Sequence, residues 1–219
     1  MKRGSIFCAL WAFCCLMMFA QDKTHHLTLF RDYKPATILM TSGKVVKAPL
    51  ANIFLKNASL LYKRGTETME AYMKTIKSAQ VGDMWFVNID DKMAQLVDSV
   101  GANRLYCITE IDMEAYEAHL RNNVNITTNN FSDLVSGSDQ ISYSTVELER
   151  PEDQQLPLIR RYYFLYNGQL VKAHEREISR KLPKDKKHIY KTILSLQEFS
   201  WLDPDSLLMM LKAISEKSE

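Results

Sequence analysis

Cysteine is scarce in this chain, and most of it lies at one end. Of the four cysteines in 219 residues, Cys8, Cys14 and Cys15 fall within the first twenty positions, and Cys107 stands alone after them. A lone cysteine forms no internal disulfide and cannot supply the cysteine pair of a structural zinc site. Because Cys107 lies in the strand-like run 105–108, we interpret it as a small buried hydrophobe rather than a nucleophile.

Glycine is also sparse, which excludes several catalytic and cofactor motifs. The seven glycines stand singly at turns, so the sequence has no glycine-rich phosphate loop and no Gly-x-Ser-x-Gly nucleophile elbow. A zincin motif is absent as well, because the residue four positions after His174 is Ile178. We therefore predict no catalytic, cofactor-binding or metal-ligating residues and no cofactor.

The first twenty residues have the parts of a secretory signal peptide. Lys2 and Arg3 supply a positive start, residues 6–19 are apolar, and Ala20-Gln21 suits cleavage. The segment is too short and wrongly flanked for a membrane span. The sequence thus predicts export, with no transmembrane span once the leader is removed.

Removal of the leader also removes the net charge of the chain. The full sequence has 28 Lys and Arg against 26 Asp and Glu, and loss of Lys2 and Arg3 leaves 26 of each. The mature chain then has no excess positive charge to attract a nucleic acid, so a nucleic-acid partner is not expected. One basic run persists as a possible surface for an anionic partner, although interleaved acidic residues are typical of a solvated face. The run comprises Lys172, Arg176, Arg180, Lys181, Lys184, Lys186, Lys187 and Lys191.

Carboxylates close together in the sequence are the remaining candidates for catalysis. General acid–base catalysis needs two carboxylates that converge across a cleft, whereas sequence neighbours are usually solvated surface. The candidate pairs are Asp90-Asp91, Glu147 with Glu149, and Glu175 with Glu177.

The clearest structural signal in the sequence is that of a hairpin around Asn167-Gly168. A two-residue type I′ turn needs positive φ at both central positions, which Asn-Gly adopts with little strain. This turn pairs Phe164 with Val171 and places both on one face with Tyr162, Tyr166 and Ala173. We interpret these side chains as core, and we expect the second strand to run on into solvent after Ala173.

Turn signals and spacing divide the rest of the chain. Short strand-like runs over 36–111 predict a β-meander or small barrel, followed by a helix over 112–120. Residues 121–140 are polar and are interpreted as a loop, and 141–148 as a strand. Helical spacing covers 184–198, and Asp203-Pro204 begins a last helix, with Phe199 and Trp201 pinning the two helices together.

We therefore predict an α+β protein in four parts. These are a signal peptide (1–20), a β-rich N-terminal unit that is a meander or small barrel (21–120), a polar loop (121–140), and a C-terminal unit with a second β-hairpin and two helices packed on the sheet (141–219).

This layout resembles a group of bacterial proteins. The shared features are Tyr-Tyr-Phe-Leu-Tyr-Asn-Gly-Gln-Leu-Val (162–171), the helix start Leu-Pro-Lys-Asp-Lys (182–186), the final Leu-Leu-Met-Met-Leu-Lys-Ala-Ile (207–214) and the leader end Ala20-Gln21-Asp22. The chain is similar in these to small secreted and envelope proteins of Bacteroidota-type bacteria. The resemblance implies a compartment and a fold, and no activity.

The expected function is that of an exported bacterial envelope protein, periplasmic or outer-membrane-associated, that acts as a non-catalytic binding or assembly module. Its partner would be another envelope protein or a surface polysaccharide. The alternative is a hydrolase acting on envelope glycan or peptide. A pocket with several ionisable groups of shifted pKa would favour the hydrolase, and a partly apolar patch or an open sheet edge would favour the module.

Overall fold

One antiparallel sheet of ten strands runs through the protein. The computed structural model describes residues 27–123 and 156–216, and the strands follow the order β10-β9-β8-β7-β6-β5-β1-β2-β3-β4. Neighbours in sequence are mostly neighbours in the sheet, as in a meander, except that β1 lies between β5 and β2. The strands are β1 (Lys34–Met40), β2 (Val45–Phe54), β3 (Ser59–Arg64), β4 (Glu67–Glu70), β5 (Ile76–Val81), β6 (Met84–Ile89), β7 (Lys92–Val100), β8 (Asn103–Ile111), β9 (Leu158–Tyr166) and β10 (Gln169–Lys172).

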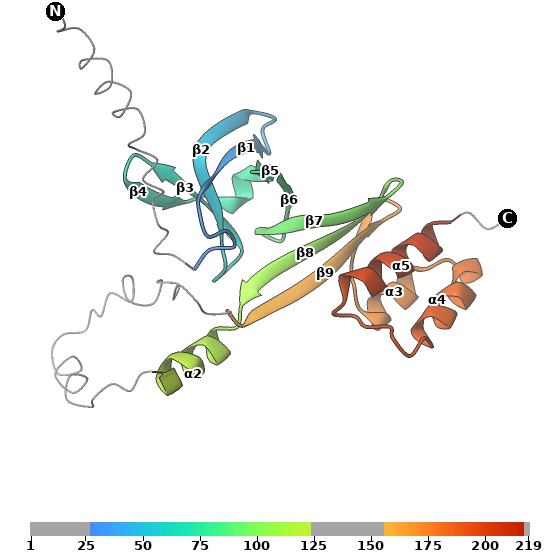
Figure 1. Cartoon of the computed structure of the whole chain (residues 1–219). Coiled ribbons are helices and arrows are strands. Elements are labelled where there is room, and N and C mark those ends of the chain that lie inside the picture. The colour runs from blue at the N-terminus through green and yellow to red at the C-terminus, as the bar shows by residue number, and fades with distance from the viewer. Residues whose placement is uncertain (1–26, 124–155, 217–219) are drawn as a thin grey trace, which may run out of the picture.

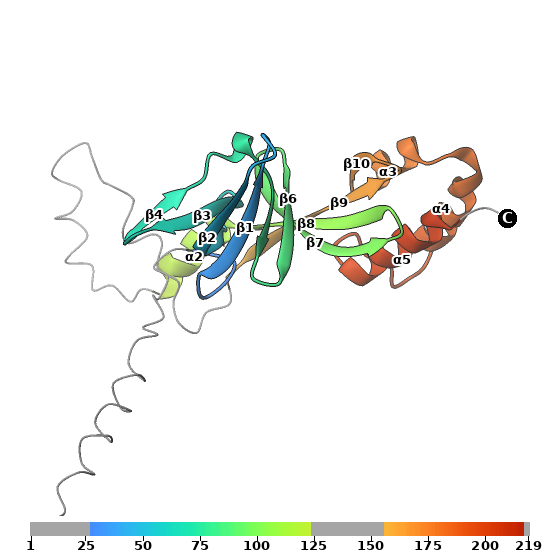
Figure 2. The same ribbon diagram turned by 90° about the horizontal axis from the view of Figure 1, so that it is seen from above.

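The N-terminal strands curl but do not close. Strands β1 to β6 bend around one end, and β7, β8 and β9 run lengthwise to helices at the other end (Figures 1 and 2). Hydrogen bonds from Met93 N to Ala58 O (2.7 Å) and from Ile111 N to Leu55 O (2.8 Å) tie the β2–β3 turn to β7 and β8 across the curl. The strand order has two end strands, β10 and β4, so the sheet is open. Of the two predicted forms, the meander is correct and the small barrel is not.

The central hairpin was predicted correctly in turn, register and face. Asn167 and Gly168 have φ of 48° and 75°, and Phe164 pairs with Val171. Strand β9 also pairs with β8 along its length, so the second β-hairpin belongs to the same sheet as the N-terminal strands.

In the part of the chain that the structure describes, four α-helices accompany the sheet. They are α2 (Met113–Asn123), α3 (Glu175–Lys181), α4 (Lys187–Leu194) and α5 (Pro204–Ser215), with short 3-10 turns η2 (Met73–Thr75) and η3 (Lys184–Lys186). Asp112 caps α2 as expected, through Ala115 N. Helix α2 runs to Asn123, so the first three positions of the predicted polar loop are helical. The rest of that loop and the strand expected over 141–148 lie outside the described residues.

Helix α3 corrects the expectation that the chain continues as a strand after Ala173. His174 Nδ1 accepts a hydrogen bond from Arg176 N (3.3 Å) and caps the helix. Acidic residues in its first turn and basic residues in its last complement the helix dipole. Ile178 and Leu182, four positions apart, are both buried. Three helices therefore follow the hairpin, where two were predicted.

Helices α3, α4 and α5 cover one face of β8, β9 and β10. Tyr162, Phe164 and Val171 point from the sheet into this core, where they meet Leu207 and Leu211 of α5. A second core lies inside the curl of β1 to β6. In residues 27–123 and 156–216, none of the helices has the length and apolar character needed to cross a membrane.

Tyr190 in the helical core predicts a loss of stability at high pH. Burial, with the nearby Glu175 carboxylate, raises the pKa of Tyr190 to about 12, and its hydroxyl donates to Glu175 O (2.9 Å). The unfolded phenol ionises near pH 10. The contribution of Tyr190 to the free energy of unfolding is therefore complete below about pH 10. It is lost as the pH rises towards 12, and the loss is about 1–2 kcal/mol.

Urea unfolding between these two pH values measures the effect. Tyr190→Phe should flatten the fall in stability, whereas Tyr72→Phe, at an exposed position, should leave it unchanged. An equally steep fall in Tyr190→Phe would refute the assignment.

Candidate functional site

A pocket of about 840 Å³ opens between the end of α4 and the start of α5. We call it the α4–α5 groove. It combines apolar with acidic side chains, and it is lined by Leu196, Gln197, Glu198, Phe199, Asp203, Asp205, Ser206 and Met209.

The connection between the two helices forms one wall of the groove. Phe199 and Trp201 meet edge to face, with ring centroids 5.0 Å apart and planes at 88°. Both rings are half-buried and pack against the helical core. The prediction that these aromatics pin the two helices is confirmed, and their packing fixes the course of the connection.

The first turn of α5 forms the opposite wall and is held by a helix cap. Ser206 donates to Asp203 Oδ2 through its backbone N (2.8 Å) and its hydroxyl (2.7 Å), and Ser206 Oγ also accepts from Ser200 N (3.3 Å). These bonds, first of all that from the Ser206 side chain, lower the pKa of Asp203. Asp203 is therefore an ionised capping group that fixes the wall.

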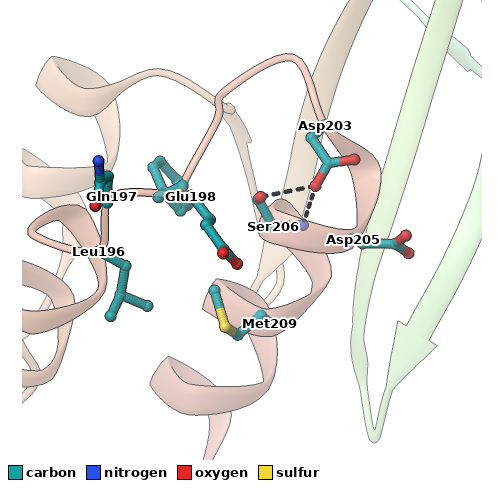
Figure 3. Close-up of a pocket in the computed structure, with 8 residues that line it drawn as sticks. Leu196, Gln197, Glu198, Asp203, Asp205, Ser206 and Met209 are labelled. Carbon is teal, nitrogen blue, oxygen red and sulfur yellow. Dashed lines mark hydrogen bonds between the residues drawn. The ribbon is translucent and has the colours of Figure 1, made fainter.

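The interior of the groove is apolar, and its rim is negatively charged. Leu196 and Met209 are 45% and 40% exposed, and they face the same space, with Glu198 reaching over it (Figure 3). Asp203 and Asp205 add two further carboxylates, and no lysine or arginine is among the described residues of the lining. Such a surface is complementary to an apolar side chain flanked by cations.

Most residues of the predicted basic run are exposed. Seven of its eight residues are exposed on β10, α3, η3 and α4. The prediction is wrong for Lys186, which is 6% exposed and donates through Nζ to Glu216 O. Lys186 is buried because the chain folds η3 against the end of α5. This contact joins residues thirty positions apart, so the residues around Lys186 do not predict it. The anionic-partner role of the other seven remains a prediction.

Two of the three predicted carboxylate pairs lie within the described residues, each in one piece of local structure. Asp90 and Asp91 form the tight β6–β7 turn, and Glu175 and Glu177 lie in the first turn of α3. Glu147 and Glu149 lie outside the described residues. Within residues 27–123 and 156–216, no three His, Cys, Asp or Glu side chains are grouped to hold a metal ion.

Cys107 is a core residue of β8. Its thiol is buried and lies 3.7 Å from Thr109 Oγ1. Burial raises the pKa of Cys107, which disfavours the thiolate that a nucleophile requires. The structure thus supports the interpretation of Cys107 as a small buried hydrophobe.

Comparison of the chain with protein-family models, curated proteins and solved structures gave no match. Function is therefore inferred from the geometry of the site.

Proposed function

We propose that this chain is an exported bacterial envelope protein, periplasmic or outer-membrane-associated, that acts as a non-catalytic binding or assembly module. The α4–α5 groove is its docking site for a segment of another envelope protein. The observation that carries the proposal is the exposed pair Leu196 and Met209 inside a rim of carboxylates, on walls fixed by a helix cap and an aromatic pair.

The chemistry of the groove specifies its occupant. Burial of the exposed parts of Leu196 and Met209 favours an apolar side chain such as Leu, Met or Phe. Glu198, Asp203 and Asp205 favour a neighbouring Lys or Arg, and they repel an acidic segment. The partner should therefore present a basic segment with an apolar anchor.

The signal-peptide pattern of residues 1–20 supports export. A positive start, an apolar middle and a small residue before Gln21 are the features that the secretion machinery recognises. The neutral mature chain also suits a protein partner better than a nucleic acid.

The groove suits binding better than hydrolysis. A general acid at neutral pH needs a raised pKa, whereas the pKa of Asp203 is lowered by its capping bonds. The carboxylates of Glu198 and Asp205 also point in different directions (Figure 3), so they do not form a convergent pair.

Cross-linked pull-down from native envelopes tests the proposal. The bait is the tagged mature protein, residues 21–219, and captured proteins are identified by mass spectrometry. Met209→Lys places a cation where the partner's anchor should lie, so it should reduce recovery of the partner at least about tenfold. The matched control is Met84→Lys, which changes a methionine of similar exposure in β6.

Recovery of one stoichiometric partner by the wild type and by Met84→Lys, but not by Met209→Lys, supports docking in the groove. Equal recovery by both variants, or no partner at all, would refute it.

A further inference from the structure

Three segments that are far apart in sequence meet beside β3 and β4. They are the β2–β3 turn, the segment from the end of β4 through η2, and the β6–β7 turn. Together they border an open hollow of about 550 Å³, which we call the three-segment hollow. It is lined by Asn57, Ser59, Glu70, Ala71, Tyr72, Met73, Lys74, Asp90, Asp91 and Lys92.

Hydrogen bonds fix the β2–β3 turn in the floor of the hollow. Met93 N donates to Ala58 O (2.7 Å), which ties the turn to β7. The Asn57 side chain accepts from Ser59 N (3.1 Å) and donates to Glu70 Oε1 (2.8 Å). The floor and the β4 wall are thus joined through one amide.

The other two segments are fixed by Asn88. Its Nδ2 donates to Met73 O (2.7 Å) and Ile76 O (2.9 Å), so the end of strand β6 holds η2 in place. These two bonds fix η2, which Tyr72 directly precedes, and Tyr72 and the Asp90-Asp91 turn line the same hollow. The backbone segments that border the hollow are therefore preorganised.

Ser59 shows an unfilled hydrogen-bonding capacity at this site. It is 2% exposed, and its hydroxyl has no hydrogen-bond partner among the described residues. Leu61 pairs directly with Glu70, and Ser59 lies two positions before Leu61 on the same strand. The side chains of Ser59 and Glu70 are therefore on the same face of the sheet, the face of the hollow. Buried hydroxyls without a partner are rare in native proteins and call for an explanation, of which a bound water or ligand is one.

The chemistry of the lining matches a polyhydroxylated ligand. Sugar hydroxyls both donate and accept, and the hollow offers carboxylates as acceptors together with ammonium and amide donors. Tyr72 is 68% exposed, and its ring offers a flat apolar surface for the C–H face of a sugar. Lys92 Nζ is held by Glu110 (2.6 Å), so within this lining Lys74 is the ammonium group left to offset Glu70, Asp90 and Asp91. The lining is therefore negative, which disfavours acidic sugars.

We propose that the three-segment hollow binds a neutral sugar unit of a glycan, with Tyr72 as its apolar platform and Asp90, Asp91 and Glu70 as acceptors of its hydroxyl protons. The hollow shares no residue with the α4–α5 groove. The proposal of a sugar site is therefore tested independently of the proposal of protein docking.

Isothermal titration of the mature protein with neutral tetrasaccharides tests the proposal. The probes are cellotetraose, chitotetraose and mannotetraose, with tetragalacturonate as the acidic comparison. At least one neutral probe should bind, and more tightly than the acidic one. Tyr72→Ala should weaken that binding at least about fivefold, and Asp91→Asn about tenfold. Asn suits the positive φ of 61° at this position, so the turn is retained.

Matched variants outside the hollow control for general effects. Trp85→Ala removes another exposed aromatic ring, and Asp83→Asn another exposed turn carboxylate, and both should leave binding unchanged. Ser59→Ala separates a ligand contact from a structural role. It should weaken binding while the Tm stays the same or rises, because an unsatisfied buried hydroxyl is removed.

The proposal is overturned if no neutral probe binds at concentrations up to about 10 mM, if tetragalacturonate binds more tightly than all neutral probes, or if Trp85→Ala weakens binding as much as Tyr72→Ala. A drop in Tm without a change in affinity for Ser59→Ala would also count against the ligand role of this hydroxyl.

Discussion

Phe164→Ala is expected to lower the free energy of unfolding by about 3–5 kcal/mol. Phe164 is 1% exposed near the C-terminal end of β9, where the sheet meets α3 and α5. Its removal takes a large apolar side chain from the core and leaves a cavity between layers that are each held in place by backbone hydrogen bonds. Because this core is what attaches the helices to the sheet, the loss should fall on the whole helical region.

Urea denaturation followed by circular dichroism measures this loss. The control is Leu170→Ala, which shortens an exposed side chain in β10, on the strand next to Phe164, and should change stability by less than about 1 kcal/mol. Similar losses in the two variants would show that the helices do not pack on β9 as described.

The double variant Lys92→Met and Arg161→Met is expected to lose about 3 kcal/mol of stability. Glu110 of β8 is buried, and its carboxylate receives Lys92 Nζ (2.6 Å) on one oxygen and the Arg161 guanidinium on the other. The cations come from β7 and β9, on either side of β8. Removal of both leaves a buried carboxylate without a counter-charge, whereas removal of either one leaves a partner in place.

The losses should therefore be non-additive. Each single variant should lose less than half of the total, and Glu110→Gln added to the double variant should restore much of it, because the buried charge is gone. If the single losses simply add up, or if Glu110→Gln restores nothing, the three groups do not act as one cluster.

The sequence predicted an element correctly where residues within that element determine it. Asn167-Gly168 determines both the turn and the register of β9 and β10, and Asp203-Pro204 supplies a cap and a first helical position for α5. Helix α3 was missed because it follows β10 without a proline or glycine, and its cap is a histidine instead of one of the usual capping residues.

The sites were less predictable than the fold, because they depend on how distant segments meet. The aromatic pair Phe199 and Trp201 was recognisable beside its helices, but the opposition of Leu196 and Met209 follows from how α4 and α5 pack. The turns at Asn57 and Asp90-Asp91 are each short local features of the chain. Their convergence on one hollow requires the curl of the sheet, which no local pattern encodes.

Site-specific photo-cross-linking at the groove tests the proposed docking most directly. A photoreactive amino acid replaces Leu196 in the groove or, as a control, the similarly exposed Leu170 in β10, and the proteins are irradiated in native envelopes. The docking model predicts one cross-linked partner from position 196, joined through a segment with an apolar residue beside Lys or Arg, and none of it from position 170. Absence of a cross-link at 196, the same partner from both positions, or attachment through an acidic segment would contradict it.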